Sequence, residues 1–241
     1  MAANDYDVDS LARYLCLAPS QVAKMAERGQ LPARRIGGEW RFSEVEVHRW
    51  LEEQLEGGDA GVRYVENVLD VSQGKQLEIT IAGLLSPDGI ALPLLARTRS
   101  SVIGSMVEVA AQTGYLWDVA RMEDAVRARE HLHSTALGNG VALLHPRRPL
   151  PDILAQSFLA LGRTNTGIPF GDERGGLTDI FFLICSLDDA THLRILARLS
   201  RLFLEKDMLA AIREATSPAE LCAKIGEIET QAFAQLGGNA S

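Results

Sequence analysis

The imidazole of His145 comes directly after a short apolar run, in a position suited to carrying a phosphoryl group. Residues 141–144 (VALL) follow the turn signal of residues 138–140 (GNG) and are therefore predicted to form a buried strand of an α/β sheet. Pro146 ends the strand because it lacks an N–H, which leaves His145 at the carboxyl end, where open α/β sheets usually place their sites. Phosphorylation of an imidazole requires an accessible ring nitrogen, a compensating positive group and donors for the phosphate oxygens. We therefore predict that His145 is a phosphate carrier.

Residues on both sides of His145 follow a recognisable order. Upstream lie Arg129-Glu130, Ser134-Thr135, Gly138-Asn139-Gly140 and Ala142. Downstream lie the segment 167–170 (GIPF), the strand-like run 178–184 (TDIFFLI) and the segment 191–199 (THLRILARL). This order resembles the type 2 enzyme IIA domains of bacterial sugar phosphotransferase systems, whose members include mannitol, fructose and nitrogen-regulatory proteins. The resemblance covers roughly residues 85–235, about the size of one domain.

The resemblance implies a role for each residue of a phosphohistidine site. His145 accepts the phosphoryl group, His192 lies beside it and hydrogen-bonds the phosphate, and Arg129 supplies positive charge. Ser134 and Thr135 are expected to bind the phosphate as supporting hydroxyls, together with Arg147. The implied partner is a phosphorylated HPr-like carrier protein. Reversible transfer to an imidazole then needs no bound metal and no organic cofactor.

Two neighbours of His145 depart from the family pattern and leave a second function open. Leu144 stands where the family usually has proline, and Pro146 stands where it has a small residue. The alternative is a transcription regulator that is not phosphorylated and uses a degenerate enzyme IIA domain as a sensor or dimerisation module. A further alternative passes the phosphate on for sugar uptake. His131 and His133 have no companion ligands in the sequence, so no metal site is predicted.

The first 55 residues carry a separate pattern. Apolar spacing predicts a helix over residues 8–17 and a second over residues 21–28, followed by a hairpin on the Gly37-Gly38 turn. Ser43 and Glu46 then form a capping-box pattern for a helix that ends near residue 55. This order resembles the winged helix-turn-helix domain of the excisionase and MerR-like class. Trp40 and Trp50 are expected in the core of so small a domain.

By this analogy the domain binds DNA, with the second helix in the major groove and the hairpin against phosphates. The residues expected at the DNA are Gln21, Lys24 and Arg28 of the helix, and Arg34, Arg35 and Arg41 of the hairpin. Residues 1–58 hold seven lysine and arginine residues against ten aspartate and glutamate residues, so binding would rest on one basic edge. A possible homodimer would strengthen it. The alternative is a helix-turn-helix fold used as a protein adaptor.

The chain is therefore predicted to be an α/β protein with two domains and a linker. Residues 1–57 are expected to form a winged helix-turn-helix, residues 58–84 a linker with a hinge at residues 57–61, and residues 85–241 an α/β sandwich with a mixed sheet flanked by helices. Helices in this last part are expected at residues 101–112, 117–130, 192–203, 207–215 and 217–235, and strands at residues 90–92, 141–144, 152–161 and 179–185.

Composition is consistent with a cytoplasmic protein that does not insert into membranes. The hydrophobic content of 46% suits ordinary cores, and no run has the apolar length of a membrane span. The three cysteines are scattered in apolar surroundings, as expected for reduced, buried residues. A net charge of −8 argues against general affinity for nucleic acids or anionic membranes and leaves only local basic regions for such binding.

Overall fold

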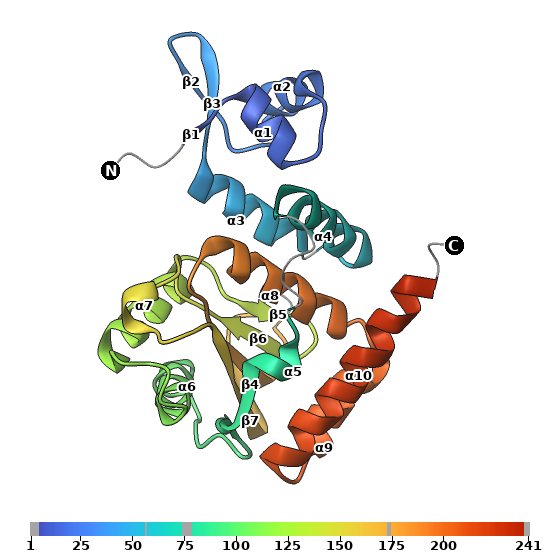
Figure 1. Ribbon diagram of the computed structural model, residues 1–241. Coiled ribbons are helices and arrows are strands. Elements are labelled where there is room, and N and C mark those ends of the chain that lie inside the picture. Colours follow the sequence, from blue (N-terminus) through green and yellow to red (C-terminus); the bar gives the residue numbers. More distant parts are fainter. Residues whose placement is uncertain (1–4, 56, 74–78, 173–174, 239–241) are drawn as a thin grey trace. The chain divides into compact units, whose positions relative to one another are not determined.

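The computed structural model describes residues 5–55, 57–73, 79–172 and 175–238, which group into two compact units (Figure 1). The first unit comprises Met1–Glu78 and Leu196–Leu204, and the second comprises Ile79–Ile195 and Glu205–Ser241. Within the described ranges, no helix combines the length and the apolar character that crossing a bilayer requires.

The first unit contains two short helices, a hairpin and two longer helices. In chain order its elements are β1 (Asp5–Tyr6), α1 (Val8–Tyr14), α2 (Pro19–Glu27), β2 (Arg34–Ile36), β3 (Glu39–Ser43), α3 (Glu44–Leu55) and α4 (Asp59–Gln73). Gly37 and Gly38 both have positive φ, as a two-residue hairpin turn requires. The strand β1 was not expected, because two residues are too few to show periodicity. It pairs with β3 on the side opposite β2, so the order is β1-β3-β2.

Aliphatic side chains and one phenylalanine form the core of this small fold. Trp40 and Trp50 are only half-buried, so the prediction that they form the core is wrong. Phe42, which is fully buried on β3, occupies the central position instead. The other buried apolar residues come from the three helices of the motif and the residues that follow them: Leu11, Ala12, Leu15, Val22, Ala26, Leu31, Val47, Leu51 and Leu55.

Helix α4 occupies much of the segment that the sequence predicted as hinge and linker. It packs against α3 and α1, and the rings of Trp50 and Tyr64 meet edge-on with centroids 6.1 Å apart. A Cβ atom on Gly61, inside α4, would overlap the carbonyl oxygen of Gln54 in α3. Residues 59–61 of the expected hinge therefore belong to α4, and Gly61 permits the close approach of two helices.

The second unit is built around one sheet. Its elements are α5 (Ile81–Leu84), β4 (Leu85–Ala91), α6 (Arg99–Gln112), α7 (Val119–Leu132), β5 (Ala136–Leu137), β6 (Val141–Leu144), the 3-10 turn η1 (Pro151–Ile153), β7 (Phe158–Pro169), β8 (Leu177–Cys185), α8 (Asp189–Leu202), α9 (Lys206–Glu214) and α10 (Pro218–Gly238). Helix α8 begins in this unit, and its last turns group with the first unit.

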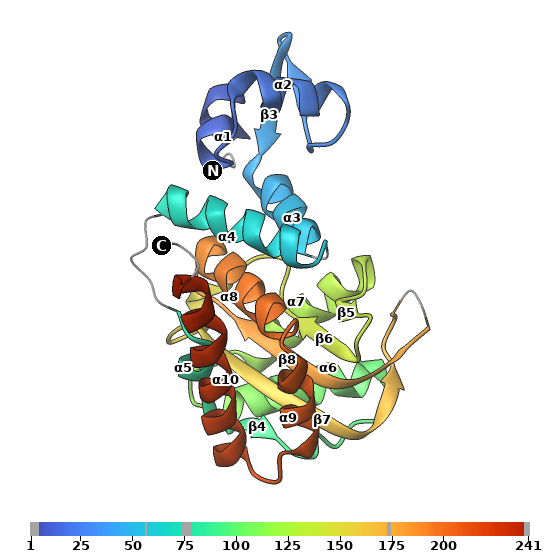
Figure 2. The same ribbon diagram turned by 90° about the vertical axis from the view of Figure 1, so that its right-hand side faces the viewer.

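The five-stranded sheet is mixed and covered on both faces, as predicted. The strand order is β4-β7-β8-β6-β5, with β4 parallel to β7 and β6 parallel to β8. Helices α6 and α7 cover one face, while α9 and α10 lie on the other (Figures 1 and 2). On β6, Ala142 and Leu144 join the apolar cluster with α6 and α7, and the alternate residues Val141 and Leu143 are buried as well. Successive side chains of a strand point to opposite faces, so this burial shows that both faces are covered.

Three predicted boundaries in this unit need correction. The strand expected over residues 152–161 begins at Phe158 and runs to Pro169, because Pro151 opens a 3-10 turn and the polar stretch 163–166 continues the strand without an apolar signal. The strand expected over residues 90–92 is the last part of the longer β4. Helix α8 begins at Asp189, three residues before the predicted start.

Candidate functional site

His145 has the strand-end position that the sequence predicted. It follows β6 directly, and its side chain is buried. Its ring Nδ1 lies 2.7 Å from the backbone carbonyl oxygen of Leu143. A carbonyl oxygen only accepts hydrogen bonds, so this contact places the proton on Nδ1 and the lone pair on Nε2. The backbone contact therefore leaves Nε2 as the ring nitrogen that carries the lone pair.

Arg129 reaches the same nitrogen from the last turn of α7. Its Nε–H donates to Nε2 of His145 over 3.2 Å, which agrees with a lone pair on that atom. Its Nη1 donates to the carbonyl oxygen of His133 over 2.9 Å, immediately beyond the helix. This second contact fixes the side chain across the end of α7. The guanidinium is therefore held where negative charge on His145 would develop.

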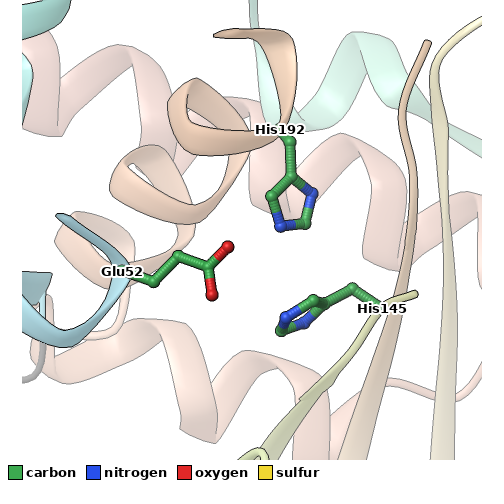
Figure 3. Close-up of side chains that lie close together, drawn as sticks. All are labelled: Glu52, His145 and His192. Atoms are coloured by element: carbon green, nitrogen blue, oxygen red, sulfur yellow. The ribbon is translucent and has the colours of Figure 1, made fainter. Parts of the chain in front are cut away.

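His192 lies beside His145, as the resemblance implied. The two ring centroids are 4.9 Å apart and the rings are tilted by 55° (Figure 3). His192 is the fourth residue of α8, and its Nδ1 lies 3.3 Å from the hydroxyl oxygen of Ser186. The carboxylate of Asp188 caps the helix by accepting from both the N–H and the hydroxyl of Thr191. The first turn of α8 thus places a second imidazole next to the first.

The hydroxyls of Ser134 and Thr135 are engaged with the buried carboxylate of Glu130. Ser134 donates to Glu130 Oε1 over 3.0 Å, and Thr135 donates to Glu130 Oε2 over 2.7 Å. Nη2 of Arg99 in α6 donates to the same carboxylate over 2.8 Å and to the Glu130 carbonyl over 2.6 Å. Glu130 is only 3% exposed, so these donors satisfy a charge with little access to water. Both hydroxyls therefore brace the chain between α7 and β6.

The remaining residues near the motif are exposed. Arg147 lies two positions after His145 with an exposed side chain. His131 belongs to α7 and His133 follows it, so the two do not share a strand face, and both are exposed. Arg147 is thus available at the surface beyond the strand end, while the two histidines lie outside the His145 and His192 pair.

Taken together, the second unit places a histidine, a guanidinium and a second imidazole side by side. A neutral imidazole presents Nε2, a guanidinium donates to that nitrogen, and a second imidazole stands beside it. These are the features that phosphoryl transfer to histidine requires. Sequence reasoning gave no role to Arg99 or to the carbonyl of Leu143. The spacing of Glu130 with Ser134 and Thr135, four and five residues later, was the available signal for the bracing network.

The residues expected at DNA are presented by α2 and the hairpin of the first unit. Gln21 and Lys24 are exposed on one face of α2, and Arg28, the exposed residue that caps its C-terminus, continues the same spacing. In the hairpin, Arg35 pairs with Trp40 across the two strands, and its guanidinium lies 4.6 Å from the Trp40 ring centroid. Stacking of this kind holds an exposed arginine in a fixed orientation.

The other two hairpin arginines are paired with acidic residues. Arg34 lies 2.6 Å from the carboxylate of Asp5, and Arg41 lies 2.9 Å from that of Glu39. In each pair one partner is exposed and the other is partly exposed, and ion pairs with such access to water are worth about 1 kcal/mol or less. A phosphate group could therefore compete for either guanidinium.

Comparison with known families gives two matches. The family model described as "Phosphoenolpyruvate-dependent sugar phosphotransferase system, EIIA 2" matches residues 83–227. A helix-turn-helix domain model matches residues 6–55.

Two curated relatives each match more than half of the chain. The fructose-specific EIIABC component of the PTS system from Bacillus subtilis (strain 168) is 30% identical over 139 residues, which are 57% of this chain and 21% of that protein. The nitrogen regulatory protein of Bradyrhizobium diazoefficiens is 29% identical over 136 residues, which are 55% of this chain and 86% of that protein. The chain thus spans about a fifth of the first relative's length and most of the second's.

Solved structures show the same fold. The nitrogen regulatory protein IIA-Ntr of Neisseria meningitidis aligns with a TM-score of 0.54 and 24% identity, covering 60% of this chain and 98% of its own. The IIA mannitol structure from Escherichia coli aligns with a TM-score of 0.51 and 20% identity, covering 58% of this chain and 98% of its own.

Proposed function

Because the chain belongs to the EIIA 2 family of the phosphoenolpyruvate-dependent sugar phosphotransferase system and also carries a helix-turn-helix domain, we propose that it is a phosphohistidine regulator of DNA binding. In this function His145 accepts a phosphoryl group from a phosphorylated HPr-like carrier. The observation that carries the proposal is the contact of Nε2 of His145 with Arg129 while Nδ1 donates to Leu143.

The transfer is a displacement at phosphorus. The lone pair of His145 Nε2 forms the new N–P bond as the N–P bond of the donor phosphohistidine breaks, and the electron pair of that bond leaves with the donor nitrogen. The Nδ1 proton stays in its hydrogen bond to Leu143, so attack needs no base. Arg129 turns from Nε2 toward the phosphoryl oxygens and offsets their charge, and His192 and Arg147 donate to the same group. Because His145 is buried, its Nε2 must become accessible before the donor can reach it.

The hydroxyls of Ser134 and Thr135 act indirectly in this proposal. Both are occupied by Glu130, so they hold the segment that carries Arg129 and leave direct contact with phosphate to other donors. The alternative of a degenerate, unphosphorylated domain rests on Leu144 and Pro146 flanking the histidine. With these neighbours, the ring still has its Nε2 paired with a guanidinium, and this favours an active phosphate acceptor.

We further propose that the first unit binds duplex DNA, with α2 in the major groove and the hairpin on the phosphates. The exposed face of Gln21, Lys24 and Arg28 would read bases, and Arg34, Arg35 and Arg41 would position the domain. A homodimer would double these contacts and match a two-fold DNA site. Use of the fold as a protein adaptor would leave mutations on this face without effect on DNA binding.

The test is phosphorylation of the purified full chain by phosphoenolpyruvate, enzyme I and an HPr-type donor. Intact mass is expected to show one phosphoryl group that acid removes, present in the wild type and absent in His145→Ala. His131→Ala, which removes an exposed histidine of α7, is the matched control and should be phosphorylated normally. Absence of phosphate on the wild type with an active donor would contradict the proposal and favour the sensor. Onward transfer to a sugar permease component would favour transport.

A further inference from the structure

Helix α8 is shared by the two units. Its first turn carries His192, whose ring lies beside that of His145 in the second unit. Its later residues, within Leu196–Leu204, group with the unit that contains the helix-turn-helix. From His192 to Arg201 the helix rises about 14 Å at 1.5 Å per residue. One continuous element thus connects the phosphate site to the other unit.

Arg201, in the last turn of α8, forms ion pairs with two carboxylates of α4. Its Nε and Nη2 donate to the two oxygens of Glu66 over 3.1 and 2.6 Å, and its Nη1 donates to Asp59 over 3.0 Å. The hydrogen bonds that Arg201 donates to Glu66 raise the pKa of Arg201 above its ordinary value. The arginine side chain is only 7% exposed. A two-pronged pair of this kind fixes both distance and orientation, and loss of its acidic partner would leave a buried charge uncompensated.

Helix α4 links the Arg201 contact to the elements expected at DNA, because it packs against helices that contact them. It packs against α3 and α1, and α1 packs against α2, the helix expected in the major groove. Its buried face consists of Val62, Val65, Val68 and Leu69. Close-packed side chains transmit displacement because they have no free volume to absorb it. A movement of α4 would therefore reach α2 through α1.

Phosphorylation acts at the opposite end of α8. It adds a charge of about −1.5 to −2 beside the first turn of the helix. Backbone N–H groups and the positive end of the helix dipole attract such a charge, and His192 stands in that turn as a donor. The energy of this interaction depends on where α8 lies, so phosphate on His145 favours one position of the helix over others.

We propose that α8 transmits the phosphorylation state of His145 to the helix-turn-helix unit through the contact of Arg201 with Glu66 and Asp59. This inference rests on the proposed function. The coupling is reciprocal, because a contact that changes with phosphorylation must in turn change the equilibrium of phosphate transfer from the donor.

Hydrogen–deuterium exchange of the full chain, with and without phosphate on His145, tests this coupling. In the wild type we expect the exchange rate of peptides within residues 59–73 to change about fivefold or more on phosphorylation, the lower end of typical coupling factors. Glu66→Gln removes the charge pairing but keeps the size of the side chain, and Arg201→Lys keeps the charge without the paired donors. Both should accept phosphate and lose the response in α4. Arg49→Gln, an exposed arginine of α3, should keep it.

Intact mass measured on the same samples separates the possible failures. Unchanged α4 exchange in fully phosphorylated wild type would overturn the coupling while leaving phosphotransfer intact. A full response in Glu66→Gln or in folded Arg201→Lys would overturn the assigned contact. Failure of the wild type to accept phosphate would overturn this inference together with the proposed function.

Discussion

The carboxylate of Glu130 determines where the neighbouring Arg129 can point. It receives hydrogen bonds from Arg99, Ser134 and Thr135, residues that come from α6 and from the segment after α7. Because Arg129 is the preceding residue, this bracing fixes the backbone from which its guanidinium reaches His145. Glu130 is a positioning residue, since it acts on the imidazole only through its neighbour.

At the residue scale, Glu130→Gln should impair phosphate transfer. The amide turns one acceptor oxygen into a donor that faces the Thr135 N–H and hydroxyl, so the brace loosens. We expect the rate of phosphorylation to fall about tenfold, the equivalent of about 1.4 kcal/mol. Rapid-quench measurement with a phosphorylated HPr-type donor checks this rate.

Two comparisons keep the Glu130 result interpretable. Glu108→Gln, on the exposed side of α6, should transfer at the wild-type rate. If Glu130→Gln is folded but no longer positions Arg129, the nitrogen NMR signals of the His145 ring should shift while the circular dichroism spectrum stays unchanged. A wild-type rate in Glu130→Gln would show that the brace has no part in the site.

At the element scale, Gly61 permits the first turn of α4 to lie close to the last turn of α3. Gly61→Ala would place a methyl group onto the carbonyl oxygen of Gln54, and backbone cannot swing aside as a flexible side chain would. We expect a loss of about 1–3 kcal/mol in the free energy of unfolding of the first unit, the usual cost of overpacking.

Denaturant unfolding, followed by the fluorescence of Trp50 near Tyr64, measures that loss. Gly58 has a positive φ and open space around it, so Gly58→Asn provides a control at a neighbouring glycine. Equal stability of Gly61→Ala and wild type would contradict the close approach of the two helices.

Strongly patterned elements were predictable from sequence, and short or polar ones were not. The three helices of the first motif, its glycine hairpin and the β6 strand all carry clear periodicity or turn chemistry. The second half of β7 escaped prediction because residues 163–166 are polar and show no apolar pattern, and the pairing with β8 is irregular between Arg163 and Ile168. The segment of helix α4 was assigned to the linker because glycines at residues 57 and 58, just before the helix, and at residue 61, in its first turn, resemble a hinge.

The residues of the candidate site could be predicted from the sequence, but their contacts could not. His145, His192 and Arg129 come together from three separate elements, as the family resemblance implied. The tautomer of His145 could not be predicted, because it depends on a backbone carbonyl whose direction only the fold defines. The contact of Arg201 with α4 also joins residues 135 and 142 positions apart in sequence, so no local pattern marks it.

At the scale of the whole molecule, the chain combines an acidic overall charge with a few exposed arginines on one small unit. The net charge of −8 disfavours nonspecific attraction to DNA, so affinity should depend strongly on individual basic residues. Arg35→Gln removes the guanidinium that stacks on Trp40. We expect it to weaken duplex binding. The slope of the logarithm of the binding constant against the logarithm of the salt concentration should become less steep by about 0.9, which corresponds to the loss of one phosphate contact.

Fluorescence anisotropy with a duplex selected from a random library, across a range of salt concentrations, provides this slope. Arg13→Gln is the matched control, because Arg13 is an exposed arginine of α1 outside the expected interface. An equal loss of slope in both variants would contradict a phosphate-binding role for the hairpin and indicate a diffuse charge effect.

Phosphoryl transfer to Nε2 of His145 is tested most directly by long-range proton–nitrogen correlation NMR of the full chain before and after reaction with a phosphorylated HPr-type donor. Before transfer, the His145 ring should show a protonated Nδ1 and an unprotonated Nε2, as its contacts with Leu143 and Arg129 require. After transfer, phosphorus coupling should be found on Nε2 of this ring alone. Phosphate on Nδ1, on another residue or on none would contradict the account.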